Sequence, residues 1–438
     1  MTVAIIKTKA EQSLQADFAA RATELPGTAV VAKARAEAMT SFERQGLPHR
    51  RVEAWKYTDL RANLKDLAPI ATRDDAAVSS AELNAALGPL AAIDADRIVF
   101  VNGSYRPELS TAKPQIAVST LGAKLRAGTA PAALKVATGE SVVALNEALV
   151  TDGAIIEIKD GASLLKPLML VHVAAGAKPK FASLRHAVKV GRNGAATIIE
   201  AHVTLAGAAA SQSNTVVEAV IGDNADVTHF LISLEGGSAT HVETLAATLG
   251  KDATFKSFQL TAGTGLARNQ SFVTFAGEGG KLDISGLMLA RAHQHIDTTL
   301  VIDHAVPNCE SRELFKTVLD DTARSVFQGK VIVRPDAQKT DGKQMAKALM
   351  LSEACEFDSK PELEIYADDV VCGHGATVAE IDPGMMFYLR SRGIPKDEAR
   401  AMLIESFVGE ALEKIDDEGL RETLSEIARQ WLVSRSAT

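Results

Sequence analysis

The sequence predicts a mainly β protein, with a parallel β-helix at its centre and α-helical regions on both sides. The first observation is a degenerate repeat of turn-like glycines with separations of 30, 31, 28 and 27 residues, at Gly161, Gly191, Gly222, Gly250 and Gly277. The second is the content of each unit, which has room for about three short strands and few helical periods. A stacked coil explains this recurrence, because each unit leaves an edge that only the next rung can pair.

The N-terminal part, residues 1–95, is expected to be helical and to end in a linker. Ala, Glu, Gln and Arg dominate Gln12 to Glu24 and Ala32 to Arg44, and neither stretch contains Pro or Gly. From Ala68 to Asp96 the composition becomes Ala-rich with interspersed Asp, Ser and Pro, which is typical of weak helix and linker. Arg50 to Leu60 reads RRVEAWKYTDL, and a surface turn anchored by its two aromatics is the simplest interpretation.

Residues 96–380 are expected to form the β core, with clear repeats from about residue 153. Near its start, RIVFVNGSYRP runs from an apolar β-branched stretch into Asn102-Gly103, a strong hairpin signal. An antiparallel sandwich would show such dipeptides at a steady spacing of about 8–12 residues and gives no reason for the longer repeat. Lys343 to Phe357 contains good helix formers, so stacking would have to override local propensity there.

Residues 381–438 are expected to form helices. Asp382 is a good N-cap before Pro383, and the helix that they begin should stop at Gly393. Pro395 opens a second helix and a third follows, with apolar residues on one side of each: Ala399, Met402, Leu403, Phe407, Ala411 and Ile415, then Leu420, Leu424, Ile427 and Trp431. Such helices either cap the open end of the β-helix or dock a partner.

Composition and motifs argue against several classes of protein. A formal charge of −8 with intermixed acidic and basic residues argues against nucleic acid as a partner. We expect no membrane association, because the sequence has no apolar run of about 18 residues and the N-terminus no secretory leader. Three cysteines are too few for a disulfide framework and suit a reducing compartment, by default the cytoplasm. GxxxxGK[ST], GxSxG, HExxH and the dinucleotide fingerprint do not occur, so ATP hydrolysis by this chain is not expected.

Cys372 and His374 in VVCGHGATV are the main candidate site residues. On a strand they would share one face, about 7 Å apart, which is close enough to bind one metal ion. Two ligands are too few for a structural zinc site, so a buried cysteine beside a histidine is the simpler interpretation. Cys309 and Cys355 show no metal-binding spacing.

A second candidate group lies in RAHQHID. His293 and His295 are expected to share a strand face that Asp297 continues, with His304 following. Histidines arranged in this way can bind metal, but a solvated face of the β-helix is the more common reason for such a pattern.

The stretch PELEIYADDVVCGHGATVAEIDPGMMFYLRSRGI, Pro361 to Ile394, resembles the SufB/SufD family of the SUF system for iron–sulfur cluster assembly. RRVEAWKYTDL is similar to the N-terminal signature of that family. The order CGHGATV then FYLRSRGI resembles the SufD branch, because the SufB branch typically has a more acidic first phrase and a cysteine where Leu389 stands.

The resemblance implies a right-handed parallel β-helix that acts as a scaffold without turnover of its own. It implies a SufB partner paired through the ends of the two β-helices, and the ATPase SufC bound through residues 381–438. Our candidates for the SufC contact are Met402, Leu403, Phe407 and Trp431. His374 matches the family position implicated at the SufB–SufD junction, with Cys372 beside it, so both are candidate metal ligands shared with SufB.

The resemblance implies no intrinsic cofactor; iron or a nascent cluster would be held transiently at the junction. The family is also associated with iron acquisition, and the chain alone is expected to form a homodimer. Some SUF complexes are linked to reduced flavin, but the sequence has no flavin motif. Three alternatives stay open: a SufB-type scaffold, a β-helix enzyme acting on polysaccharide, and a structural protein whose C-terminal helices only cap the coil.

Overall fold

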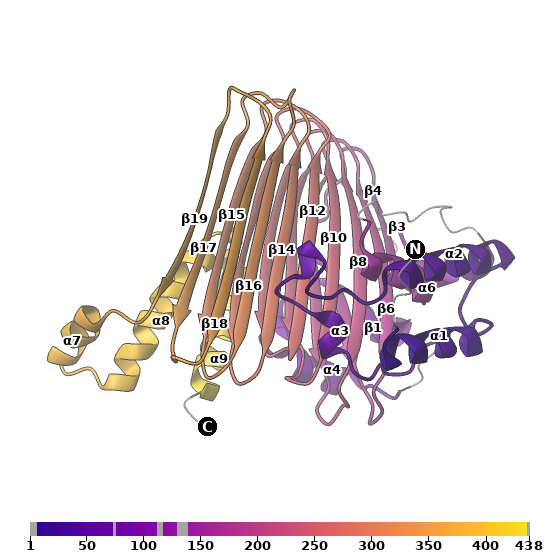
Figure 1. Ribbon diagram of the computed structural model, residues 1–438, viewed down its shortest axis with the longest axis horizontal. Helices are drawn as coiled ribbons and strands as arrows, with labels where there is room; N and C mark the ends of the chain where they lie inside the picture. The colour runs from indigo at the N-terminus through magenta and orange to yellow at the C-terminus, as the bar shows by residue number, and fades with distance from the viewer. Residues whose placement is uncertain (1–6, 73–75, 112–116, 129–138, 436–438) are drawn as a thin grey trace.

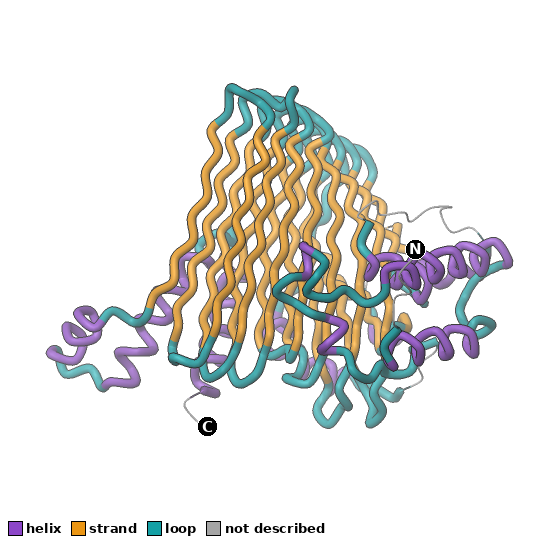
Figure 2. Tube along the Cα trace, in the orientation of Figure 1, coloured by secondary structure: helices purple, strands orange, loops and turns teal. Residues whose placement is uncertain are grey.

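Two β-sheets wind into a parallel β-helix in the computed structural model, which describes residues 7–72, 76–111, 117–128 and 139–435 (Figures 1 and 2). Within these ranges, sheet I has the order β19-β17-β15-β13-β11-β9-β7-β5-β1-β2 and sheet II the order β18-β16-β14-β12-β10-β8-β6-β4-β3. The strands of sheet I are β1 (Asp96–Val101), β2 (Ser104–Tyr105), β5 (Leu168–Ala174), β7 (Ala195–Thr204), β9 (Asp226–Leu234), β11 (Thr254–Ala262), β13 (Lys281–Ala290), β15 (Glu310–Leu319), β17 (Asp341–Met350) and β19 (Val371–Ala379). Those of sheet II are β3 (Ala117–Thr120), β4 (Ala154–Ile158), β6 (Phe181–Val190), β8 (Gln212–Ile221), β10 (Thr240–Leu249), β12 (Leu266–Phe275), β14 (His295–His304), β16 (Arg324–Val333) and β18 (Glu356–Ile365).

The predicted parallel β-helix is confirmed, with one correction to its coil. Strands one coil apart pair in parallel, as β9 pairs with β7 and β11. The expectation of three short strands per unit is wrong, because from β6 onward each coil has two strands of nine or ten residues. Turn-forming residues gather at two points of each unit, and the alternating pattern between them continues without a break.

Stacking of the turns explains the repeat glycines. Asn193, Asn224 and Asp252 each lie two residues after such a glycine and have left-handed φ angles of 54°, 54° and 53°. The glycine itself is needed for close approach: a Cβ on Gly277 would lie 2.0 Å from the amide nitrogen of Lys251 in the turn one coil earlier. For Gly191, Gly222, Gly250 and Gly277 the recurrence therefore reports a steric requirement of stacked turns, whereas Gly161 has open space around it and a left-handed φ of 69°.

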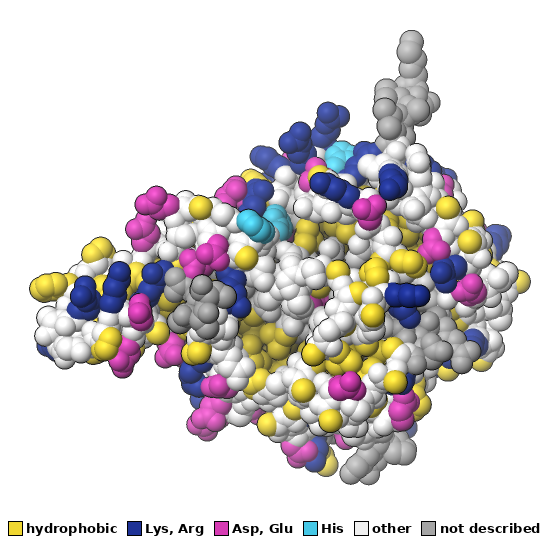
Figure 3. All heavy atoms as spheres, turned by 90° about the horizontal axis from the view of Figure 1, so that it is seen from below, with side chains coloured by type: hydrophobic (Ala, Val, Ile, Leu, Met, Phe, Trp, Pro, Cys, Tyr) yellow, Lys and Arg dark blue, Asp and Glu magenta, His cyan; other side chains and the backbone are white. Residues whose placement is uncertain are grey.

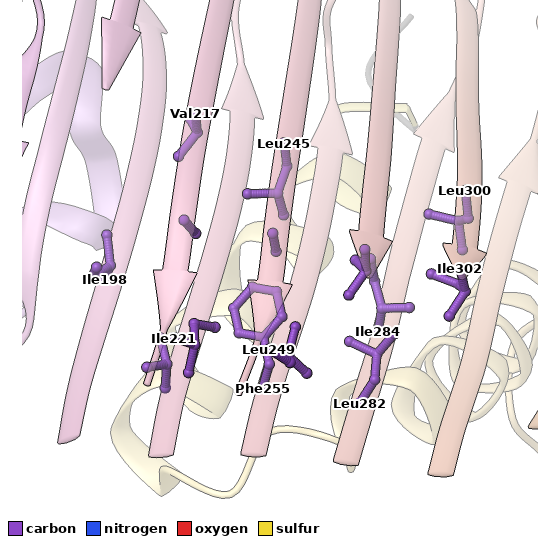
Figure 4. Packing of buried hydrophobic residues seen from close by; sticks show 14 of the residues in the cluster. Ile198, Val217, Ile221, Leu245, Leu249, Phe255, Leu282, Ile284, Leu300 and Ile302 are labelled. Carbon is purple, nitrogen blue, oxygen red and sulfur yellow. The ribbon is translucent and has the colours of Figure 1, made fainter. Parts of the chain in front are cut away.

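The interior of the coil, which we call the lumen, holds the main hydrophobic core. Inward-facing residues of successive strands stack on one another, among them Val217 and Ile221 of β8 and Leu245 and Leu249 of β10 (Figure 4). Each coil repeats the same alternation of inward-facing and outward-facing residues, so each coil adds a layer to the core of the coil before it.

Two local predictions are confirmed. Asn102 and Gly103 form the turn between β1 and β2 with φ angles of 46° and 82°, the left-handed pair that a two-residue hairpin turn requires. The helix-prone stretch that begins at Lys343 lies largely in β17, which pairs with β15 and β19. Two ladders of hydrogen bonds therefore override its local helical propensity.

The N-terminal helices cover the outside of the β-helix. They are α1 (Lys9–Arg21), α2 (Ala29–Gln45), η1 (Glu53–Trp55), α3 (Leu60–Asn63), α4 (Ser80–Leu87), η2 (Gly88–Ala92), η3 (Pro107–Leu109), α5 (Leu121–Ala127) and α6 (Ser141–Leu149). Residues 1–6 and 73–75, which belong to the stretches expected as helix and linker, lie outside the described residues. In RRVEAWKYTDL, Trp55 is fully buried and the guanidinium of Arg268 lies 3.9 Å from its ring centre, so this segment anchors the N-terminal region to sheet II.

The three C-terminal helices are α7 (Pro383–Ser391), α8 (Lys396–Leu412) and α9 (Glu418–Arg435). Asp382 caps α7 as predicted, accepting hydrogen bonds from the backbone N–H groups of Gly384 and Met385. Helices α8 and α9 pack on the outer face of sheet I, and α7 projects beyond β19 (Figure 1). Of the alternatives considered for these helices, capping the end of the coil is not what the structure shows: the apolar sides of α8 and α9 cover the outer face of sheet I.

The surface carries charges of both signs. Seen from below, Lys and Arg side chains are interspersed with Asp and Glu, and α7 at the left adds hydrophobic and basic side chains (Figure 3). In the described part of the chain, none of the helices is both long and apolar enough to cross a bilayer.

Candidate functional site

The C-terminal end of the β-helix is an open end. Among the described residues, β18 and β19 are the last strands of their sheets and each pairs with a neighbour on one side only. Large apolar side chains are exposed there: Tyr366 and Val371 to about 60%, and Val378 to 56%. An unpaired edge with exposed apolar residues is a surface that proteins normally cover, so it indicates an interface.

Cys372 and His374 lie on this last strand. The prediction that they share a face is confirmed, because β19 is extended over both residues and Cys372 packs against the lumen core. Cys372 is half-buried, and burial raises the pKa of its thiol. His374 is exposed although it faces the lumen side, because no described coil covers β19. The imidazole is therefore accessible from outside, and the half-buried thiol lies two residues earlier on the same strand.

Two buried polar residues that were not predicted from the sequence stand behind His374 in the same row. Glu313 of β15 pairs in register with Gln344 of β17, which in turn pairs with His374. Both side chains are about 3% exposed, and burial raises the pKa of Glu313 to about 8. The signal was present in the sequence: the three positions are separated by 31 and 30 residues, the length of one coil.

The other two cysteines are not brought to this site. Cys309 and Cys355 are buried in the lumen core, where the Cys309 thiol donates to the Gly277 carbonyl one coil earlier and the Cys355 thiol to the Ser352 carbonyl in its own turn. Burial raises the pKa of Cys309. Buried thiols in an apolar core are unreactive, which agrees with the absence of a metal-binding spacing around these two cysteines.

The expected pair of His293 and His295 is corrected by the structure. His293 lies in the turn before β14, where Ala292 has a φ of 54°, and its Nδ1 lies 2.7 Å from the Thr322 hydroxyl. His295 is the first residue of β14 and hydrogen-bonds to Thr58 of the N-terminal segment at 2.8 Å. The turn separates the two rings, so they do not share a strand face.

The four residues predicted to contact SufC differ in their surroundings. Met402 is 43% exposed, whereas Leu403 and Phe407 are half-buried, and Phe407 packs against the core between α8 and sheet I. Trp431 is only 6% exposed and belongs to the core beneath α9. The larger exposed apolar side chains are on α7, which the sequence analysis did not single out: Met385, Phe387 and Tyr388.

The chain is a parallel β-helix with an unpaired edge and with a thiol and an imidazole on its last strand. Residues 172–407 match the family model described as the SufBD core domain of SUF-system FeS cluster assembly, and residues 9–170 match the SufBD N-terminal region. The chain therefore belongs to the SufB/SufD family of the SUF iron–sulfur cluster assembly system.

Individual relatives agree with this assignment. The chain is 34% identical to the iron–sulfur cluster assembly protein SufD of Escherichia coli, over 86% of this chain and 88% of that protein. It is 32% identical to a SufBD family protein of Synechocystis, over 84% of both chains. It is 29% identical to SufD of Bacillus subtilis, over 65% of both chains. The resemblance to the SufD branch, which rests on Pro361 to Ile394, is confirmed.

Proposed function

We propose that this chain is a non-catalytic scaffold subunit that pairs with a SufB-type protein through the open end of its β-helix. The observation that carries the proposal is the pair of unpaired edge strands, β18 and β19, with exposed Tyr366, Val371 and Val378. A second β-helix that ends in the same way would add its strands to these edges and cover the apolar side chains.

The proposed assembly places the reactive side chains at a shared site. Cys372 and His374 supply sulfur and nitrogen donors, which suit iron and iron–sulfur chemistry. Two donors are fewer than a cluster or an iron ion normally takes, so the remaining ligands would come from the partner. We therefore propose that iron or a nascent cluster is bound transiently between the two chains as cargo.

We also propose that the ATPase SufC binds at α7 and the exposed side of α8. Phe387 is 75% exposed and Met402 is 43% exposed, whereas the other side of α8 is covered by sheet I. The chain has no phosphate-binding GxxxxGK[ST] sequence, so a separate subunit would supply the hydrolysis of ATP.

The outer surface of sheet II gives little support to the alternative of a β-helix enzyme that acts on polysaccharide. Such an enzyme needs carboxylates that converge on an exposed face and are available to substrate. The acidic side chains there are engaged by neighbouring bases: Asp358 with Arg324, Glu364 with Lys330. The described carboxylates of β18 therefore form ion pairs along the sheet.

The main test is purification of the chain together with SufB-type and SufC partners. We expect a stable complex, and Val378→Lys should prevent pairing with the SufB-type protein while SufC binding persists, because a buried unpaired charge is costly. Val30→Lys, on an exposed position of α2, is the matched control. Pairing that withstands Val378→Lys would argue against the open end as the interface.

The reactive pair needs a different test. His374→Ala should leave the complex intact while lowering its content of iron and sulfide; a normal cluster yield would contradict the assigned role. For SufC, substitutions are better than truncation, because removal of α8 and α9 would expose the covered face of sheet I. Phe387→Glu and Met402→Glu should abolish SufC binding, and Val433→Glu on the exposed side of α9 is the control.

A further inference from the structure

A polar chamber lies inside the β-helix beside the hydrophobic core, far from Cys372 and His374. Inward-facing histidine and glutamate side chains from both sheets meet there, from β5, β7, β9 and β10 and the turn after β9: His172, Glu200, His202, His229, Glu235, His241 and Glu243. All of these side chains are buried. Buried carboxylates and imidazoles are costly unless they are paired or bind a metal, so this concentration requires a physical reason.

The donor atoms at the centre of the chamber are close together. One ligand atom from each of Glu200, His202 and Glu243 lies within 4.8 Å of the other two. Glu243 Oε2 is also 3.4 Å from His241 Nε2 and 3.5 Å from His202 Nε2. These separations are long for hydrogen bonds. They match the roughly 3.3–3.5 Å between two ligands that bind one tetrahedral ion at about 2.0–2.2 Å each.

The donors are also left available. Within the described residues, His202 Nε2, His241 Nε2 and Glu200 Oε2 have no hydrogen-bond partner. The other atoms of two of these groups are held in place: His241 Nδ1 lies 2.9 Å from the Ser213 hydroxyl, and Glu200 Oε1 lies 2.6 Å from His229 Nε2. When His241 Nδ1–H donates to Ser213, the lone pair of Nε2 points into the chamber; metal-binding histidines typically donate their other ring N–H to a protein oxygen in this way.

A small cavity borders one of these donors, His202. It has a volume of about 30 Å³ and is lined by the buried His172, His202 and Glu235 and by half-buried residues such as Ser211. This volume is enough for one water molecule or ion. Two other groups of three donors lie in the chamber. One joins His202 and His241 with Glu235 and so shares two residues with this set. The other, His172, His186 and Glu200, is less suitable, because His186 Nδ1 accepts the Ala154 N–H at 2.9 Å and its ring proton is then on Nε2.

We propose that Glu200, His202, His241 and Glu243 form a binding site for one divalent transition-metal ion inside the β-helix. Two imidazoles and two carboxylates suit ions such as Fe²⁺, Zn²⁺ and Co²⁺ rather than Ca²⁺ or Mg²⁺, which prefer oxygen ligands. The site is separate from the proposed cluster-assembly site, and it does not depend on that proposal.

Cobalt binding to the full chain tests the inference. Metal-free protein is titrated with Co²⁺ in a Cys372→Ser/His374→Ala background, which removes the donors at the open end. We expect one Co²⁺ per chain, visible in the absorption spectrum as tetrahedral coordination by nitrogen and oxygen, together with a higher thermal unfolding midpoint. Folded protein that binds no Co²⁺ would overturn the proposal.

Variants identify the ligands. Glu243→Gln keeps the size of the side chain and should weaken Co²⁺ binding at least roughly 100-fold and abolish the metal-dependent rise in the unfolding midpoint. Ser213→Ala, which removes only the partner of His241, should weaken binding about 10-fold. His304→Gln, a buried lumen histidine stacked on Phe275, is the control and should bind normally. Equal binding by Glu243→Gln, or equal loss in His304→Gln, would refute the site.

Discussion

The protonation state of Glu313 provides a quantitative test of the structure near the open end. This carboxyl is fully enclosed in the lumen behind Gln344 and His374, and burial raises its pKa from 4.5 to about 8. Below pH 4.5 it is protonated in both the folded and the unfolded chain and has no pH-dependent effect. As pH rises toward 8, the unfolded chain loses the proton and the folded chain keeps it, so the free energy of unfolding falls.

The magnitude follows from the size of the shift. Each pH unit between 4.5 and 8 lowers the free energy of unfolding by about 1.4 kcal/mol through this one group, which amounts to roughly 3 kcal/mol at pH 7. Glu313→Gln removes the titration while keeping the size of the side chain. The variant should therefore match the original chain near pH 4.5 and exceed its stability by about 3 kcal/mol at pH 7.

Urea unfolding at pH 4.5, 7 and 8.5 measures this difference, and infrared spectroscopy at pH 7 should show a protonated carboxyl that Glu313→Gln lacks. Glu310→Gln, on an exposed position of the same strand, is the control and should show no such pH-dependent gain. A stability difference that stays constant from pH 4.5 to 8.5 would refute the reasoning, because an ionised carboxylate would then be tolerated in the lumen.

Three further predictions concern packing inside the coil and against its outer face. Trp431→Ala should lower the free energy of unfolding by about 3–5 kcal/mol and speed amide hydrogen exchange in α9; an effect below about 1 kcal/mol would mean that this ring is not core. Gly277→Ala places a Cβ 2.0 Å from a backbone nitrogen and should cost about 1–3 kcal/mol or more in urea unfolding, while Gly409→Ala on α8 meets no atom and should be tolerated. Asp297→Asn leaves the buried Arg268 without its carboxylate and should cost about 3–5 kcal/mol by the same assay; an unchanged midpoint would show that this ion pair is not needed.

Much of the coil could be predicted because its signals are local. The turn glycines, the Asn102-Gly103 hairpin and the Asp382 cap each depend on atoms a few residues apart or on one repeated steric condition. The number of strands per coil was missed, because it depends on how far a strand continues before its chain must turn.

The candidate site at the open end was predicted in part. Cys372 and His374 are two residues apart, so the strand alternation alone puts them on one face. Glu313 and Gln344 lie in one row with His374 only because three strands stack in register, although the spacing of these residues in the sequence matches the repeat.

The sequence by itself determined the class of fold and the branch of the family. A repeat of about 30 residues and a contiguous motif can both be recognised without knowledge of any long-range contact. Only the tertiary structure decided where α8 and α9 pack and which polar side chains share the lumen. His202 and His241 face one another across two different sheets, and their separation of 39 residues matches no repeat. The physical reason is that local sterics set the turns and strands, whereas the closing of the coil determines which inward-facing side chains meet across it.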